Sequence, residues 1–106
     1  MTQIKIYIVT TKLNLSEPFN LDYYLISEKL KLSLLFGGLT EDLNTKNGYW
    51  INEKEKKLEK DKVIIWEILT DKPINRKKLS GIIRTIKRKT QQISQLYTID
   101  NKPFFL

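Results

Sequence analysis

The sequence predicts one α+β domain with the fold of a ferredoxin-like split β-α-β sandwich, in which two helices cover one face of an antiparallel sheet. Three observations predict this fold. The chain has 106 residues, which leaves room for a single domain spanning residues 1–106. Some segments have alternating apolar and polar residues or a short continuous apolar run, as strands do, and two others repeat apolar residues at helical spacing. Their order along the chain is β-α-β-β-α-β, which is the order of the ferredoxin-like motif.

The first half of the chain predicts a strand followed by a helix. Residues 4–10 alternate isoleucines with Lys5, Tyr7 and Val9, which indicates a strand with one buried face. The segment 16–20 contains a proline and offers Ser16 or Asn20 as a cap for a helix over residues 21–35. The glycines at 37 and 38 end this helix. Its apolar stripe includes Leu25, Leu32 and Phe36 with Ile26, Leu30 and Leu34 beside them, while Glu28, Lys29 and Lys31 are expected outside.

The second half predicts a hairpin, a helix and a last strand. A short strand over residues 49–52 and a second strand over 63–69 enclose a charged loop at 53–61. The second strand is apolar on both faces apart from one charge, so we place it and the first strand in the middle of the sheet. Asn75 caps a helix over 76–92, in which Gly81 is expected where the helix closely approaches the sheet. A final strand over 94–99 ends at a turn over 100–103. The buried stripe of this helix is expected to be Leu79, Ile82, Ile83, Ile86 and Ile93.

The absence of cysteine and histidine excludes several kinds of chemistry. Disulfides, thiolate nucleophiles, histidine metal sites and Ser-His-Asp arrangements all lack their main group. We therefore predict no cofactor and no metal site, and we favour a non-catalytic protein while leaving an enzyme open. The chain starts without the pattern of a signal peptide and has no apolar run that could span a bilayer, which predicts a cytoplasmic protein without membrane contact.

The positive charge is concentrated in the last third of the chain. Residues 1–70 have ten lysines and ten acidic residues, whereas residues 71–106 have nine basic residues and two acidic ones, a net charge of +7. The second helix carries the three arginines of the chain. Its outer face is the predicted site for nucleic acid or another polyanion, because guanidinium groups suit phosphates. This site consists of Arg76, Lys77, Lys78, Arg84, Lys87, Arg88 and Lys89.

Three functional hypotheses follow from these patterns. The leading one is a non-catalytic binding protein of a mobile element, a virus or a bacterium of low GC content, because alanine is absent while lysine, isoleucine and asparagine are abundant. It would form a homodimer through the apolar open face of the sheet. The main alternative is an adaptor or inhibitor whose basic helix docks on an acidic protein. The third hypothesis is an enzyme or small-molecule binder with a loop pocket at Thr40, Tyr49 and Trp50.

One motif indicates a relationship to a known group of proteins. Phe36-Gly37-Gly38-Leu39-Thr40, followed by Gly48-Tyr49-Trp50, resembles a family of small uncharacterised proteins of bacteria, phages and plasmids that share a Phe-Gly-Gly-x-Thr…Gly-x-Trp pattern. The resemblance covers the middle half of the chain. It implies a fold and a genomic setting, and it implies no activity.

Overall fold

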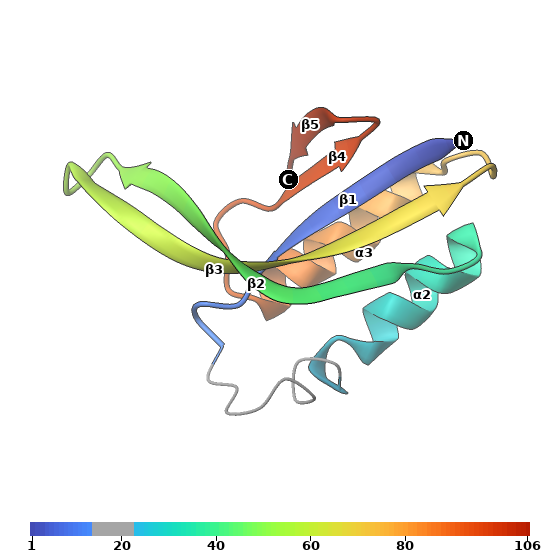
Figure 1. Ribbon diagram of the computed structural model, residues 1–106, viewed down its shortest axis with the longest axis horizontal. Helices are drawn as coiled ribbons and strands as arrows, with labels where there is room; N and C mark the ends of the chain where they lie inside the picture. Colours follow the sequence, from blue (N-terminus) through green and yellow to red (C-terminus); the bar gives the residue numbers. More distant parts are fainter. Residues whose placement is uncertain (14–22) are drawn as a thin grey trace.

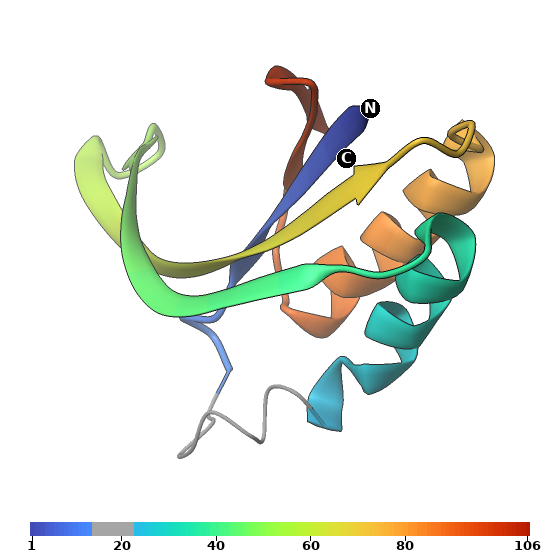
Figure 2. The same cartoon turned by 45° about the vertical axis from the view of Figure 1, so that its right-hand side comes forward.

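The computed structural model describes residues 1–13 and 23–106, and the proposed caps Ser16 and Asn20 lie outside these residues. One antiparallel sheet has the strand order β2-β3-β1-β4-β5. The helices α2 (Ile26–Phe36) and α3 (Arg76–Lys89) lie side by side on one face of this sheet (Figures 1 and 2). The strands are β1 (Thr2–Val9), β2 (Thr40–Asn52), β3 (Lys57–Thr70), β4 (Leu96–Ile99) and β5 (Lys102–Phe105).

The core lies between the helices and the two most apolar strands. In the register of β1 and β3, Ile6 is opposite Trp66, and the isoleucines on either side also face each other. All of these side chains are buried, and they pack against Leu32 and Phe36 of α2 and Ile83 of α3. The predicted alternation of the first strand is therefore confirmed, and so is the central position of both strands, since each has a neighbouring strand on both sides.

The ferredoxin-like split β-α-β sandwich predicted from the sequence is wrong for this chain. Asp100 and Asn101 both have positive φ angles, 48° and 66°, and form a tight turn. The segment after this turn pairs with β4 as a fifth strand, which the sequence analysis left as a turn and a short tail. Pro103 is compatible with this strand because β5 is at the edge of the sheet, where one side of the backbone needs no partner.

The second difference is a long two-stranded ribbon made by β2 and β3. The predicted charged loop at 53–61 is mostly strand. Residues 53–56 form a turn, and β3 begins at Lys57. Lys57 forms ion pairs with Glu55 of the turn and with Glu59 of the same strand. Since β1 pairs with β3 only from Val63 onward, the outer half of the ribbon has no third strand beside it. Figure 2 shows it curling away from the helices.

Helix α2 buries a narrower stripe than the sequence predicts. Leu25, Leu32 and Phe36 are buried as expected, and Gly37 ends the helix with φ 96°. The prediction is wrong for the neighbouring apolar row and for Glu28, which was expected outside and is 2% exposed. Glu28 lies four residues before Leu32 and so on the buried face of the helix, where Lys89 of α3 is its ion-pair partner. The exposed row is Ile26, Leu30 and Leu34.

Helix α3 begins as predicted and ends three residues early. The Asn75 side chain accepts a hydrogen bond from the backbone N of Lys78, which confirms it as the N-cap. Thr90 lies past the last turn and its hydroxyl donates to Ile86 O, so the chain leaves the helix there and Ile93 is exposed rather than buried. The explanation offered for Gly81 is also wrong, since a Cβ at this position would meet no heavy atom within 4 Å.

Candidate functional site

The structure brings the predicted basic residues together on α3 but gives them different roles. Lys77, Lys78, Arg84 and Arg88 are exposed. None of these four forms an ion pair with another residue of the described chain. Arg76 lies over the ring of Phe104, with its guanidinium carbon 4.4 Å from the ring centroid. Lys87 and Lys89 are half-buried, so only part of the predicted face is open to a ligand.

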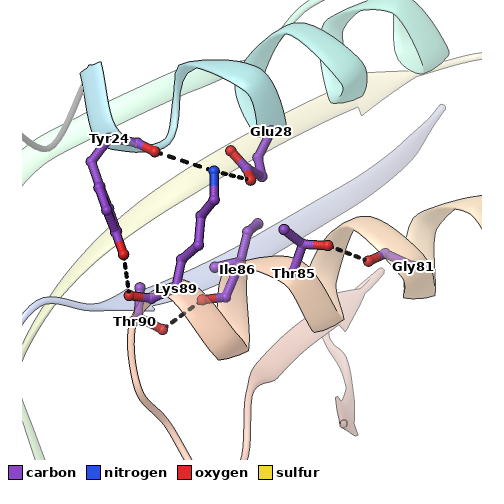
Figure 3. Close-up of polar contacts among 7 residues, drawn as sticks. All are labelled: Tyr24, Glu28, Gly81, Thr85, Ile86, Lys89 and Thr90. Carbon is purple, nitrogen blue, oxygen red and sulfur yellow. Dashed lines mark hydrogen bonds and ion pairs between the residues drawn. The ribbon is translucent and has the colours of Figure 1, made fainter.

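Lys89 points toward α2 and joins the two helices (Figure 3). Its Nζ lies 2.7 Å from Glu28 Oε1, and it also donates to the backbone O of Tyr24. The Tyr24 hydroxyl donates in return to the backbone O of Lys89 at 3.0 Å. Glu28 Oε2 is buried and has no hydrogen-bond partner among the described residues. Lys89 is therefore a structural residue rather than a contact for phosphate.

A second polar cluster connects α2 to the sheet. Glu41 Oε2 accepts from Lys29 Nζ at 2.8 Å and from the indole Nε1 of Trp66 at 2.9 Å. The ammonium group of Lys29 also lies 5.6 Å from the centroid of the Trp66 ring. Because the Trp66 side chain is fully buried, its only donor needs an acceptor inside the protein, and Glu41 supplies it.

The predicted loop pocket is not formed. Thr40 begins β2 opposite Glu67, whereas Tyr49 and Trp50 lie in the outer ribbon opposite Lys60 and Glu59. Eight residues of β2, including the bulge between Asp42 and Lys46, separate Thr40 from Tyr49. The two aromatic side chains are exposed, at 61% and 46%. Thr40 therefore does not share a pocket with these two aromatic residues.

A third group of side chains lies on the face of the sheet away from the helices. Lys5 of β1 is directly opposite Glu67 of β3, and Tyr7 is opposite Ile65, the next position on the same face. Such opposite and diagonal neighbours have Cβ atoms about 5 to 8 Å apart. All four side chains are half-buried. We call Lys5, Tyr7 and Glu67 the open-face cluster.

Neither charged side chain of the open-face cluster has a hydrogen bond or ion pair with the described residues. The Tyr7 backbone is held in place, because Gln95 Nε2 donates to its carbonyl at 2.6 Å. A carboxylate, an ammonium group and an aromatic ring thus share one surface. The two charged groups are available to bind a ligand. None of the three was among the site residues predicted from the sequence. The available signal was Glu67, the only charged residue within the apolar strand 63–69.

Asp42 lies on the same face, opposite Ile65, and its carboxylate is already engaged. Its pKa lies below the ordinary value of 3.8, because Lys46 Nζ and the backbone N of Asn44 both donate to it. The residues between Asp42 and Lys46 form a bulge in β2. A bulge locally bends its strand and strengthens the twist, so this contact sits where the ribbon turns away.

We expect Lys46→Met to raise the pKa of Asp42 toward its ordinary value, because the largest stabilising contact of the carboxylate is lost. In the parent chain this carboxylate stabilises the fold above the pKa of the unfolded chain, and the contribution disappears as the pH falls through the lower folded pKa. Carbon-detected NMR titration of the Asp42 carboxyl measures the change. Lys54→Met, in the turn of the ribbon, is the control. An unchanged Asp42 titration in Lys46→Met would contradict the assigned contact.

Among residues 1–13 and 23–106, no group of three or more acidic side chains is placed to hold a metal ion. Neither helix of this described part has the length and apolar character needed to cross a bilayer.

Comparison with known proteins gives a match in fold alone. No protein-family profile matches the sequence, and no curated protein sequence matches it. The solved structure of a phage SAM lyase in complex with S-methyl-5'-thioadenosine superimposes with a TM-score of 0.67, covering 99% of this chain and 88% of that chain at 9% identity. The phage SAM lyase in its apo state gives a TM-score of 0.66 over 99% and 87% of the two chains, also at 9% identity.

The chain therefore has the fold of the phage SAM lyases. This finding corrects the leading functional hypothesis, because the structures that share the fold are an enzyme rather than a non-catalytic protein that binds nucleic acid or an adaptor. The resemblance through the Phe-Gly-Gly motif, the homodimer and the cytoplasmic location all stay predictions.

Proposed function

We propose that this protein cleaves S-adenosylmethionine and releases S-methyl-5'-thioadenosine. The observation that carries the proposal is the match to a SAM lyase over 99% of the chain, in a structure that contains S-methyl-5'-thioadenosine. The open-face cluster is the proposed binding site. It offers a carboxylate, an ammonium group and an aromatic ring that no described part of the chain uses.

The chemistry of this cleavage suits a chain without histidine or cysteine. The bond that breaks joins the sulfonium sulfur to the aminobutyrate carbon, and its electron pair stays on sulfur. The positively charged sulfonium thereby becomes a neutral thioether, which leaves without needing a proton. A carboxylate oxygen of the same aminobutyrate group supplies the new electron pair to this carbon and closes a lactone ring, so no water is added. The enzyme consequently needs to bind and orient the substrate, and no general acid has to protonate the leaving group.

Each member of the open-face cluster has a matching group on the substrate. The Tyr7 ring would stack on the adenine, since aromatic side chains stack on any base. The Glu67 carboxylate would accept hydrogen bonds from the two ribose hydroxyls. Lys5, opposite Glu67, would pair with the substrate carboxylate. Adenine and ribose remain in the thioether product, so Tyr7 and Glu67 should also bind S-methyl-5'-thioadenosine.

The test follows the release of S-methyl-5'-thioadenosine from S-adenosylmethionine by liquid chromatography. We expect Glu67→Gln to lower kcat/KM by about tenfold to a hundredfold, since hydrogen bonds to a charged group contribute about 1.5 to 3 kcal/mol. Tyr7→Leu should lower it about tenfold or more through lost stacking. Glu53→Gln in the exposed turn and Tyr49→Leu in the ribbon are the matched controls and should retain activity.

Calorimetric titration with S-methyl-5'-thioadenosine provides a second measurement that does not depend on turnover. The parent chain should bind this product, and both open-face variants should bind it more weakly than the two controls. Product release that is undiminished in Glu67→Gln and Tyr7→Leu would show that the site lies elsewhere. A parent chain that neither binds the thioether nor consumes S-adenosylmethionine would overturn the proposed function.

A further inference from the structure

The outer sides of α2 and α3 enclose a groove on the surface opposite the open face of the sheet. Its volume is about 530 Å³. Leu34 and Leu35 of α2 and Ile82 of α3 provide apolar surface, and Gly81 and Thr85 lie beside them on α3. Lys31 and Lys78, one from each helix, add positive charge. The groove is thus apolar with a lysine from each of its two walls.

The apolar surface continues along α2 beyond the groove. Ile26, Leu30 and Leu34 are spaced by four residues and therefore form one row on the helix. Their side chains are 55%, 59% and 72% exposed. A continuous exposed apolar row of this kind indicates a surface that another molecule covers.

Gly81 opens the groove on the α3 side. Within a helix, glycine is less favourable than alanine by about 1 kcal/mol. Packing inside the described chain does not require glycine here, since a Cβ would meet no heavy atom within 4 Å. The missing side chain leaves the α3 backbone open to close approach from outside, as small residues do where two helices pack closely.

The charge around the groove has one sign. Glu28 is the only acidic residue in α2 and α3, and it is buried in its ion pair with Lys89. The exposed charged side chains of the two helices are therefore all basic, and on α3 Lys77 is next to Lys78 in the sequence. A partner that complements this surface needs an apolar stripe with carboxylates along its edges.

We propose that the α2/α3 groove binds an acidic amphipathic helix of a partner protein. The apolar stripe of that helix lies along Leu34 and Ile82 and passes over Gly81, and its carboxylates pair with Lys31 and Lys78. A concave groove fits a protruding helix better than a flat membrane surface. The proposal is independent of the proposed enzyme activity, because the groove and the open-face cluster lie on opposite sides of the sheet.

The probe is a fluorescent peptide of about 18 residues with leucines on one helical face and glutamates on the other. Its binding is measured by fluorescence anisotropy against the full chain at several salt concentrations. We expect Gly81→Leu, which fills the groove, and Lys31→Glu/Lys78→Glu, which reverses its charge, each to weaken binding about tenfold or more. Leu58→Asp and Lys54→Glu/Lys60→Glu in the ribbon are the matched controls and should bind like the parent.

Thermal unfolding shows that each variant is folded, and Gly81→Leu should be at least as stable as the parent because leucine favours the helix. NMR shift changes on adding the peptide should be centred on the methyl groups of Leu34, Leu35 and Ile82. Peptide binding unaffected by the groove variants would overturn the proposal. So would equal binding of a scrambled peptide of the same composition, or binding only to anionic lipid vesicles or duplex DNA.

Discussion

Replacing Trp66 by alanine should lower the free energy of unfolding by about 4 kcal/mol, which is a large part of the stability of a domain of this size. The side chain is fully buried in the middle of β3, opposite Ile6, so its removal leaves a large cavity between the sheet and α2. The replacement also removes the indole donor to Glu41 and the ring beneath the Lys29 ammonium group. The packing loss and the polar loss therefore act in the same direction.

Urea denaturation followed by far-ultraviolet circular dichroism measures this effect, since fluorescence would be altered by the loss of the tryptophan itself. Trp66→Phe is the informative companion, because it keeps most of the apolar volume while it removes the hydrogen bond to Glu41. It should cost about 1 to 2 kcal/mol, less than half the effect of alanine. Equal losses for phenylalanine and alanine would contradict the packing argument. A loss below about 1 kcal/mol for alanine would show that Trp66 is not a core residue.

The strands of the core could be predicted because their signal is local. The alternation in residues 4–10 identifies which side chains point to the helices, the apolar run at 63–69 identifies a central strand, and the register of β1 with β3 agrees with both. The fold assignment failed at the ends of the sheet. The charged run at 53–61 is typical of a loop, yet these residues pair as a ribbon in which lysines and glutamates lie close together. The fifth strand depends on a turn at Asp100 and Asn101.

The helix faces show why periodicity alone does not fix orientation. The apolar residues of α2 form a stripe wide enough to be buried from either of two adjacent rows. The row with Leu25, Leu32 and Phe36 faces the core, and Glu28 is buried on the same face, paired with Lys89, 61 residues further along the chain. The pattern of α2 alone does not reveal this partner, so it does not predict that Glu28 is buried.

The candidate site was only partly predictable for a related reason. The alternation in residues 4–10 puts Lys5 and Tyr7 on the face opposite the isoleucines, and the single charge in the strand 63–69 points to Glu67. The concentration of positive charge in the last third of the chain led instead to a predicted site on α3. Arg84 and Arg88 are exposed there, but Lys89 is half-buried and paired with Glu28. The match in fold to a lyase could not be found from the sequence, because the two chains are only 9% identical and the similarity lies in the path of the backbone.

Replacing Lys89 by methionine should have the second large effect on stability, about 2 to 4 kcal/mol. The variant keeps most of the side-chain length but leaves the Glu28 carboxylate, 2% exposed, without its ion pair. One carboxylate oxygen already has no partner among the described residues, so the change leaves both oxygens without one. Breaking a buried pair from one side costs about 3 to 5 kcal/mol, and the partial exposure of Lys89 reduces the figure here.

The double replacement Glu28→Leu/Lys89→Met distinguishes two contributions to stability: the cost of burying an unpaired carboxylate and the attraction between the paired charges. An apolar pair of similar volume should recover most of the lost stability, because neither side chain then needs a partner or water. Urea denaturation of the parent, the single variant and the double variant gives the comparison as a shift in midpoint. The single variant must be the least stable of the three. A double variant no more stable than Lys89→Met would mean that the pair contributes through its own attraction, and a single variant within about 0.5 kcal/mol of the parent would place Glu28 at the surface.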